Sequence, residues 1–123
     1  MATTRITSPT ALADELVVVS NVTSTSEDNV TGSTSGTIYF IEADNTENEY
    51  PVYLKIADAA SATAGTTQSQ IRLRIPKQEN STFSLLTGHA YTSGISLWVT
   101  TGPDTSDTGS PENTLTVKLL VTT

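Results

Sequence analysis

Apolar and polar residues alternate along most of this chain, and a period of two is the pattern of a β-strand with one buried and one exposed face. The segment 69–76 (SQIRLRIP) shows it most clearly, because polar residues separate Ile71, Leu73 and Ile75. Similar segments predict seven strands, at residues 16–23, 37–43, 50–57, 69–76, 81–86, 93–101 and 113–122.

These segments predict an all-β fold, an antiparallel two-sheet β-sandwich that is jelly-roll-like and has about seven to eight strands. Clean alternation favours antiparallel sheets with one solvent-facing side. Residues 1–15 show no strand periodicity and contain Pro9, so we expect an extended N-terminal arm followed by a single domain over residues 16–123. Residues 8–16 have the composition for one or two helical turns at the end of that arm.

Composition and charge exclude several function classes. The chain has no cysteine, so it forms neither disulfides nor thiolate metal sites. Its formal net charge is −7 with only six Lys and Arg residues, which argues against a nucleic-acid partner because such affinity comes mostly from cations that neutralise phosphates. An apolar run of about 18 residues, as a membrane span needs, is absent from the sequence, so we expect no membrane partner.

Candidate catalytic and metal-binding residues are few, and none lies in a recognisable motif. His89 is the only histidine, and no nucleophile elbow is found, so we interpret it as a residue of a turn. Acidic residues cluster within 42–49 and 104–107; either cluster could bind calcium weakly, but solvated turns are the favoured interpretation. We therefore expect no enzyme activity, no cofactor and no dedicated metal site.

The residues on the side of the strands opposite the core series are more informative. Five of them combine aromatic rings with positive charges: Trp98, Tyr53, Lys55, Arg72 and Arg74. One interpretation is an ordinary surface, where Lys and Arg stems shield a scattered aromatic ring. The favoured one is a contact face, since Trp, Tyr and Arg are enriched at interfaces. On that interpretation the only Trp of the chain faces a partner or a neighbouring subunit.

A family resemblance covers the chain from residue 50 to its end. A strand YLKI (53–56) is followed by a loop ATAGTT (62–67) and by an alternating strand that ends in IP (75–76). The strand TSGISLWVTTG (92–102), an Asp/Thr-rich loop and a final apolar strand complete the pattern. In this order the segment resembles small virion proteins of tailed bacteriophages. The resemblance implies a β-sandwich on the virion, of the capsid decoration (cement) type.

For such a protein the expected partner is the major capsid protein, and the expected location is the outer surface of the capsid. The net charge of −7 is consistent with this location, because the capsid interior holds anionic DNA that would repel an acidic domain. We expect a homo-oligomer and favour a trimer, since capsid lattices offer threefold positions. The alternative is a receptor- or carbohydrate-binding β-sandwich module of a phage head or tail fibre, in which exposed aromatic rings stack on sugars.

Overall fold

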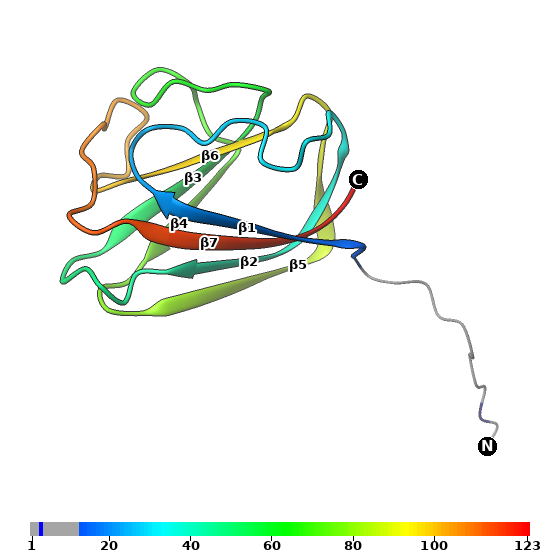
Figure 1. Cartoon of the computed structure of the whole chain (residues 1–123), viewed down its shortest axis with the longest axis horizontal. Helices are drawn as coiled ribbons and strands as arrows, with labels where there is room; N and C mark the ends of the chain where they lie inside the picture. The colour runs from blue at the N-terminus through cyan, green and yellow to red at the C-terminus, as the bar shows by residue number, and fades with distance from the viewer. Residues whose placement is uncertain (1–2, 4–12) are drawn as a thin grey trace.

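The computed structural model describes Thr3 and residues 13–123, and all regular secondary structure in that part of the chain is β-strand (Figure 1). Each of the seven predicted segments overlaps one strand. The strands are β1 (Glu15–Val22), β2 (Gly36–Asp44), β3 (Val52–Asp58), β4 (Ile71–Ile75), β5 (Asn80–Tyr91), β6 (Ile95–Thr100) and β7 (Leu115–Thr122).

The predicted N-terminal arm lies almost entirely outside the described residues. Strand β1 begins at Glu15, one residue before the predicted domain boundary. The helical turns expected over residues 8–16 fall mostly outside the described range, but Glu15 and Leu16 belong to β1, so that prediction is wrong at its C-terminal end.

The strands form two antiparallel sheets that pack face to face, as predicted. One sheet has four strands in the order β1-β7-β2-β5, and the other has three in the order β4-β3-β6. The segment 23–30 runs beside β6 as a rudimentary further strand: Glu27 and Leu97 exchange backbone hydrogen bonds of 2.8 and 3.0 Å.

The pairing is that of one long hairpin rolled into a sandwich. From the β3–β4 connection outward, β3 pairs with β4, β2 with β5, the segment 23–30 with β6, and β1 with β7. This nested order is the jelly-roll arrangement, in which about eight strands form two sheets. Here the segment 23–30 takes the place of the second of the eight strands and forms only the isolated bridge between Glu27 and Leu97.

The hydrophobic core fills the space between the two sheets. Strands β3, β6 and β7 contribute alternate aliphatic residues that are fully buried, among them Leu54, Leu97 and Leu119. The inward residues assigned from the sequence pattern are confirmed for these strands. The alternation fixes the register, because a slip of one residue would turn every apolar side chain to the wrong face.

Strand β5 is longer than the sequence predicted, and a bulge is the reason. Ile38 pairs with His89 and Phe40 with Ser84, so residues 85–88 lie opposite Tyr39 alone. Gly88 at the end of the bulge has φ of 77°, and a Cβ there would lie 2.3 Å from Cγ2 of Thr37. The bulge interrupts the alternation, which concealed the second half of the strand.

No helix in the described part of the chain is long and apolar enough to cross a membrane.

Candidate functional site

The five residues predicted to form a contact face do share one face of the three-stranded sheet. Lys55 is paired with Arg72 on one side and with Trp98 on the other. Tyr53 is paired with Arg74 in the next row of the same face. This face, which we call the outer face of the three-stranded sheet, points away from the core. Its composition follows from the register, as the alternation predicted.

Two of the five residues are nevertheless not exposed, so the predicted exposure is wrong for them. Trp98 and Lys55 each keep only 1% of their surface accessible, and both rank among the largest fully buried side chains. Arg72 and Arg74 are exposed, and Tyr53 is half-buried. Within the described chain, Trp98 therefore lies under other residues of its own molecule and does not present its ring to a partner.

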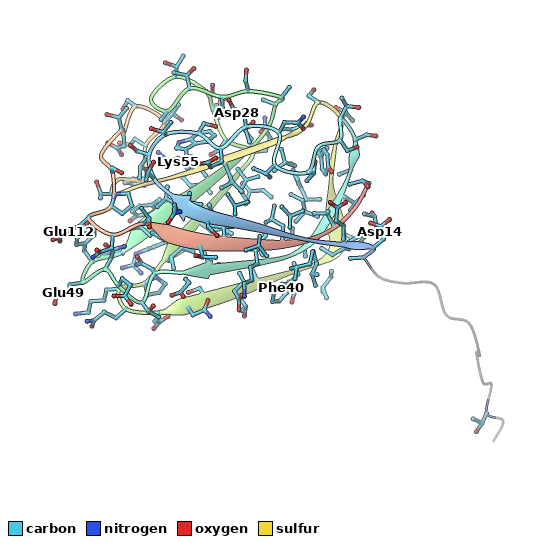
Figure 2. All side chains as sticks on the ribbon, in the orientation of Figure 1. Asp14, Asp28, Phe40, Glu49, Lys55 and Glu112 are labelled. Carbon is cyan, nitrogen blue, oxygen red and sulfur yellow. The ribbon has the colours of Figure 1, made fainter. Side chains whose placement is uncertain are left out.

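The cover over this face includes the connection between β6 and β7, which we call the 101–110 loop. Lys55, labelled in Figure 2, donates a hydrogen bond of 2.5 Å from Nζ to the carbonyl oxygen of Asp104. The guanidinium of Arg72 donates to the carbonyl oxygen of Pro103. These two cations hold the loop against the sheet.

The 101–110 loop is also held by its own hydrogen bonds. The Asp107 carboxylate accepts a 2.7 Å hydrogen bond from the amide of Asp104, and the Asp107 amide donates back to the Asp104 carbonyl at 3.0 Å. At its base, the amide of Thr101 donates to the carbonyl of Gly109 at 3.0 Å. The acidic residues at 104 and 107 therefore build a turn, which is the interpretation the sequence favoured.

Burial changes the chemistry of Lys55. Desolvation lowers the pKa of its ammonium group below the ordinary value of 10.5; nearby Arg72 lowers it further, and the carboxylates of Asp107 and Asp104 offset part of the effect. The indole Nε1 of Trp98 is buried with no hydrogen-bond partner in the described structure. The covered face thus contains two polar groups that are costly to bury, one a cation and one a neutral donor.

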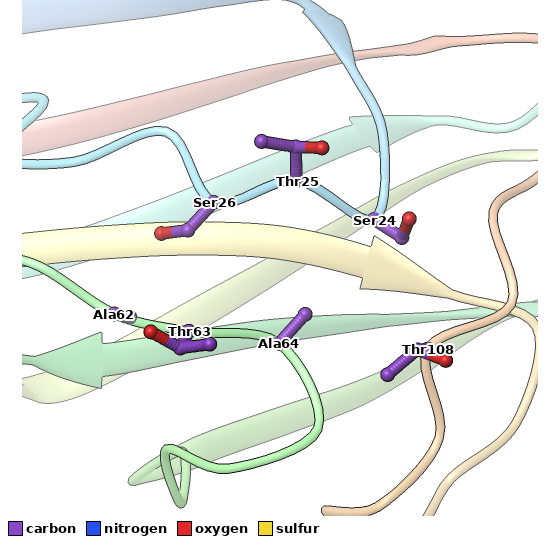
Figure 3. Close-up of a pocket in the computed structure, with 7 residues that line it drawn as sticks. All are labelled: Ser24, Thr25, Ser26, Ala62, Thr63, Ala64 and Thr108. Carbon is purple, nitrogen blue, oxygen red and sulfur yellow. The ribbon is translucent and has the colours of Figure 1, made fainter.

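A shallow groove of about 340 Å³ lies beside the cover, between the segment 23–30, the β3–β4 connection and the 101–110 loop (Figure 3). Its walls carry small side chains, most of them hydroxyl-bearing: Ser24, Thr25, Ser26, Ala62, Thr63, Ala64 and Thr108. Aromatic rings and charges are absent from this lining, so the groove lacks the stacking ring expected of a sugar site.

The acidic turn at residues 42–49 hides a structural cluster that the sequence did not reveal. Asn45 and Asn48 are fully buried there. Asn45 Nδ2 donates to the carbonyls of Tyr50 and Pro76 at 3.1 and 3.0 Å. Asn48 donates to Asn45 Oδ1 and to the Asn113 carbonyl, each at 2.9 Å, and accepts the Asn113 amide at 2.9 Å. These amides join the β2–β3, β4–β5 and β6–β7 connections at one end of the sandwich.

Neither acidic cluster forms a metal centre in the described residues. No group of three or more His, Asp or Glu side chains among them is arranged to hold a metal ion. The single histidine is not in a turn, contrary to prediction: His89 lies in β5 and is paired with Ile38 of β2.

An apolar surface on the opposite sheet was also missed. Leu16 and Val18 of β1 are 58% and 51% exposed, and Leu86 in the β5 bulge is 96% exposed. Leu16 pairs with Leu120, which in turn pairs with Phe40, so one apolar row crosses three strands on the outer face of the four-stranded sheet. The sequence signal was present, because the segment 16–23 is apolar on both faces.

The chain matches no protein-family model, and searches of curated proteins and of solved structures likewise find no match.

Proposed function

We propose that this protein is a bacteriophage capsid decoration protein that binds the outer surface of the head and stabilises it by bridging major capsid protein subunits. The jelly-roll order supports the proposal as a fold-level analogy, because such sandwiches occur in viral capsid domains and in lectins. The resemblance of residues 50–123 to small virion proteins points to the capsid. Catalysis plays no part in this function.

The observation that carries the proposal is the pair of arginines on β4. Arg72 and Arg74 are exposed on a chain whose net charge is −7, and neither forms a salt bridge with a described carboxylate. Together with half-buried Tyr53 they form a basic edge, which we call the β4 rim. Arg presents a planar fork that matches carboxylates, so this rim suits an acidic patch on a protein partner.

Trp98 and Lys55 take a different role from the one the sequence suggested. Lys55 anchors the 101–110 loop beside the rim, and Arg72 binds the same loop through Pro103. The loop and the rim therefore lie together on one surface. In this proposal the buried pair supports the contact surface, and the β4 rim makes the contact.

Binding to undecorated heads tests this function. Heads assembled from the major capsid protein are mixed with the wild type, with Arg72→Gln/Arg74→Gln and with the control Lys77→Gln/Lys118→Gln. Both variants lose two positive charges; Lys118 lies on β7 of the other sheet, and Lys77 is exposed two residues beyond the end of β4, outside the rim as defined. We expect the rim variant to bind about tenfold more weakly, as for charge pairs at an interface, and the control to bind almost normally.

Salt gives an independent measure in the same assay. Attachment through the rim is expected to weaken as the salt concentration rises, because screening acts on exposed charges. Equal losses in both double variants would show that net charge alone matters, and an absence of binding by the wild type would reject the capsid function.

No described feature favours the carbohydrate-binding alternative, because the buried Trp98 is unavailable for stacking and the groove has no aromatic lining. We expect no signal on a glycan array. The trimer expected from the sequence stays a prediction for copies bound at threefold positions of the capsid.

A further inference from the structure

Four strands lie at the edges of the two sheets, and three of them are protected against pairing with another chain. The free side of β6 is occupied by the segment 23–30, through Glu27 and through a 2.8 Å hydrogen bond from the Val30 amide to the Ile95 carbonyl. Strand β4 is short and carries two exposed arginines. Strand β5 is broken by its bulge. Covering, shortening, charging and bulging are the usual means of blocking an edge.

Strand β1 lacks these protections over residues 15–19, and its own irregularity lies further along, between Val19 and Val22, where Asn21 has φ of 58°. It is eight residues long and pairs with β7 on one side only. Its register with β7 is regular from Glu15 to Val19, and the strand contains no Lys, Arg or Pro. Its outward residues Leu16 and Val18 are more than half exposed. A regular, apolar edge of this kind is a template for strand addition.

We propose that β1 pairs antiparallel with β1 of a second copy of this chain, about a twofold axis at Val17. This register is self-complementary. Val17 faces its own counterpart, and Leu16 of each copy faces Val18 of the other on the outer side of the sheet. Glu15 faces Val19, so the acidic end of one strand meets an apolar residue rather than another carboxylate. Aliphatic pairs of this kind stabilise a sheet.

A second copy fits this edge because it brings the same apolar row, which runs from β1 across the rest of the sheet. Leu16, Leu120 and Phe40 lie side by side across β1, β7 and β2. In the paired state the two rows meet at the edge and form one apolar band over a continuous sheet. Each copy carries a net charge of −7, so copies repel one another. Salt is therefore expected to strengthen this contact, whereas it weakens the proposed capsid contact.

Sedimentation of the full chain, without capsids, tests the pairing. We expect the wild type to reach twice its mass of 13.0 kDa as its concentration rises. Val18→Lys places a charge in the contact and is expected to raise the dissociation constant about thirtyfold or more. The control is Leu86→Lys, which makes the same kind of change at a site that is 96% exposed on the same sheet, and it is expected to leave the dimer intact.

Cysteine crosslinking tests the register, since the chain has no cysteine of its own. A mixture of Leu16→Cys and Val18→Cys is expected to form disulfide-linked dimers faster than either variant alone, because these positions face each other across the axis. A monomeric wild type, a trimer, or a dimer that Val18→Lys leaves unchanged would overturn the pairing. None of these results bears on capsid binding, which is measured separately.

Discussion

The outer faces of the two sheets are built from the same alternating pattern but have different environments. On the three-stranded sheet, Lys55 and Trp98 are covered, and the 101–110 loop is bound to the Lys55 ammonium. On the four-stranded sheet, Leu16 and Val18 are more than half exposed. The face that carries cations and an indole is therefore partly shielded from water, whereas the face that carries aliphatic residues is exposed to it.

This difference shows what a strand pattern reports. Alternation separates residues that point into the sandwich from residues that point away, but it does not say whether the outward side reaches water. That depends on the connections. The connection between β6 and β7 spans residues 101–114 and is long enough to fold back over its own sheet. By contrast, the connection between β2 and β3 spans only residues 45–51.

The largest expected effect concerns the covered face. Trp98→Ala should lower the free energy of unfolding by about 3–5 kcal/mol, because it removes a large and fully buried side chain. Leu86→Ala on the open face is the matched control and should change stability by less than about 0.5 kcal/mol. Denaturant unfolding followed by circular dichroism measures both. Equal small effects would contradict the burial of Trp98.

Most of the fold was predictable from the sequence, because two-sheet architecture depends on local alternation. The seven segments and their inward residues, such as Leu54 and Leu97, follow from a period of two. The second half of β5 was missed because its bulge breaks that period near Gly88. The reduced strand at 23–30 was missed because it is held by few backbone hydrogen bonds and carries a polar sequence.

The candidate site was predictable only as a set of residues on one face. The grouping of Lys55, Arg72 and Trp98 follows from register, which alternation constrains. Their exposure depends on contacts with a loop distant in sequence, such as Lys55 with Asp104, and no local pattern encodes these contacts. The buried amides of Asn45 and Asn48 were hidden for the same reason, since Asn in a polar turn resembles a solvated residue.

The second-largest expected effect concerns Asn48, which binds the backbone of Asn113 near the C-terminal end of the β6–β7 connection. Asn48→Ala should lower the free energy of unfolding by about 2–3 kcal/mol, because it removes hydrogen bonds to Asn113 and leaves Asn45 Oδ1 buried without its donor. Glu49→Ala, next in sequence and exposed, should have little effect. Thermal melts of both variants measure the difference. Similar melting temperatures for the two would show that the amide cluster does not hold this end of the fold.

The smallest effect concerns the buried cation of the covered face. Lys55→Met keeps most of the packing volume but removes both the buried charge and the hydrogen bond to Asp104. Removing the buried charge stabilises the fold, and removing the hydrogen bond destabilises it. At neutral pH we therefore expect the free energy of unfolding to change by no more than about 1 kcal/mol. Lys118→Met, at an exposed site, is the control, although it also breaks the 3.6 Å ion pair with Glu42.

The pH dependence makes this last comparison decisive. The pKa of Lys55 is lowered in the folded state by desolvation, so the unfolded chain binds its proton more tightly than the folded one. Stability linked to Lys55 therefore rises with pH between the lowered pKa and 10.5, and it is at its minimum below that window. Urea unfolding from pH 7 to 10 should show the wild type gaining stability relative to Lys55→Met, with no such gain relative to Lys118→Met. Parallel curves for the wild type and Lys55→Met would mean that folding does not lower the pKa of Lys55, so that the Asp107 and Asp104 carboxylates fully offset the desolvation of its ammonium group.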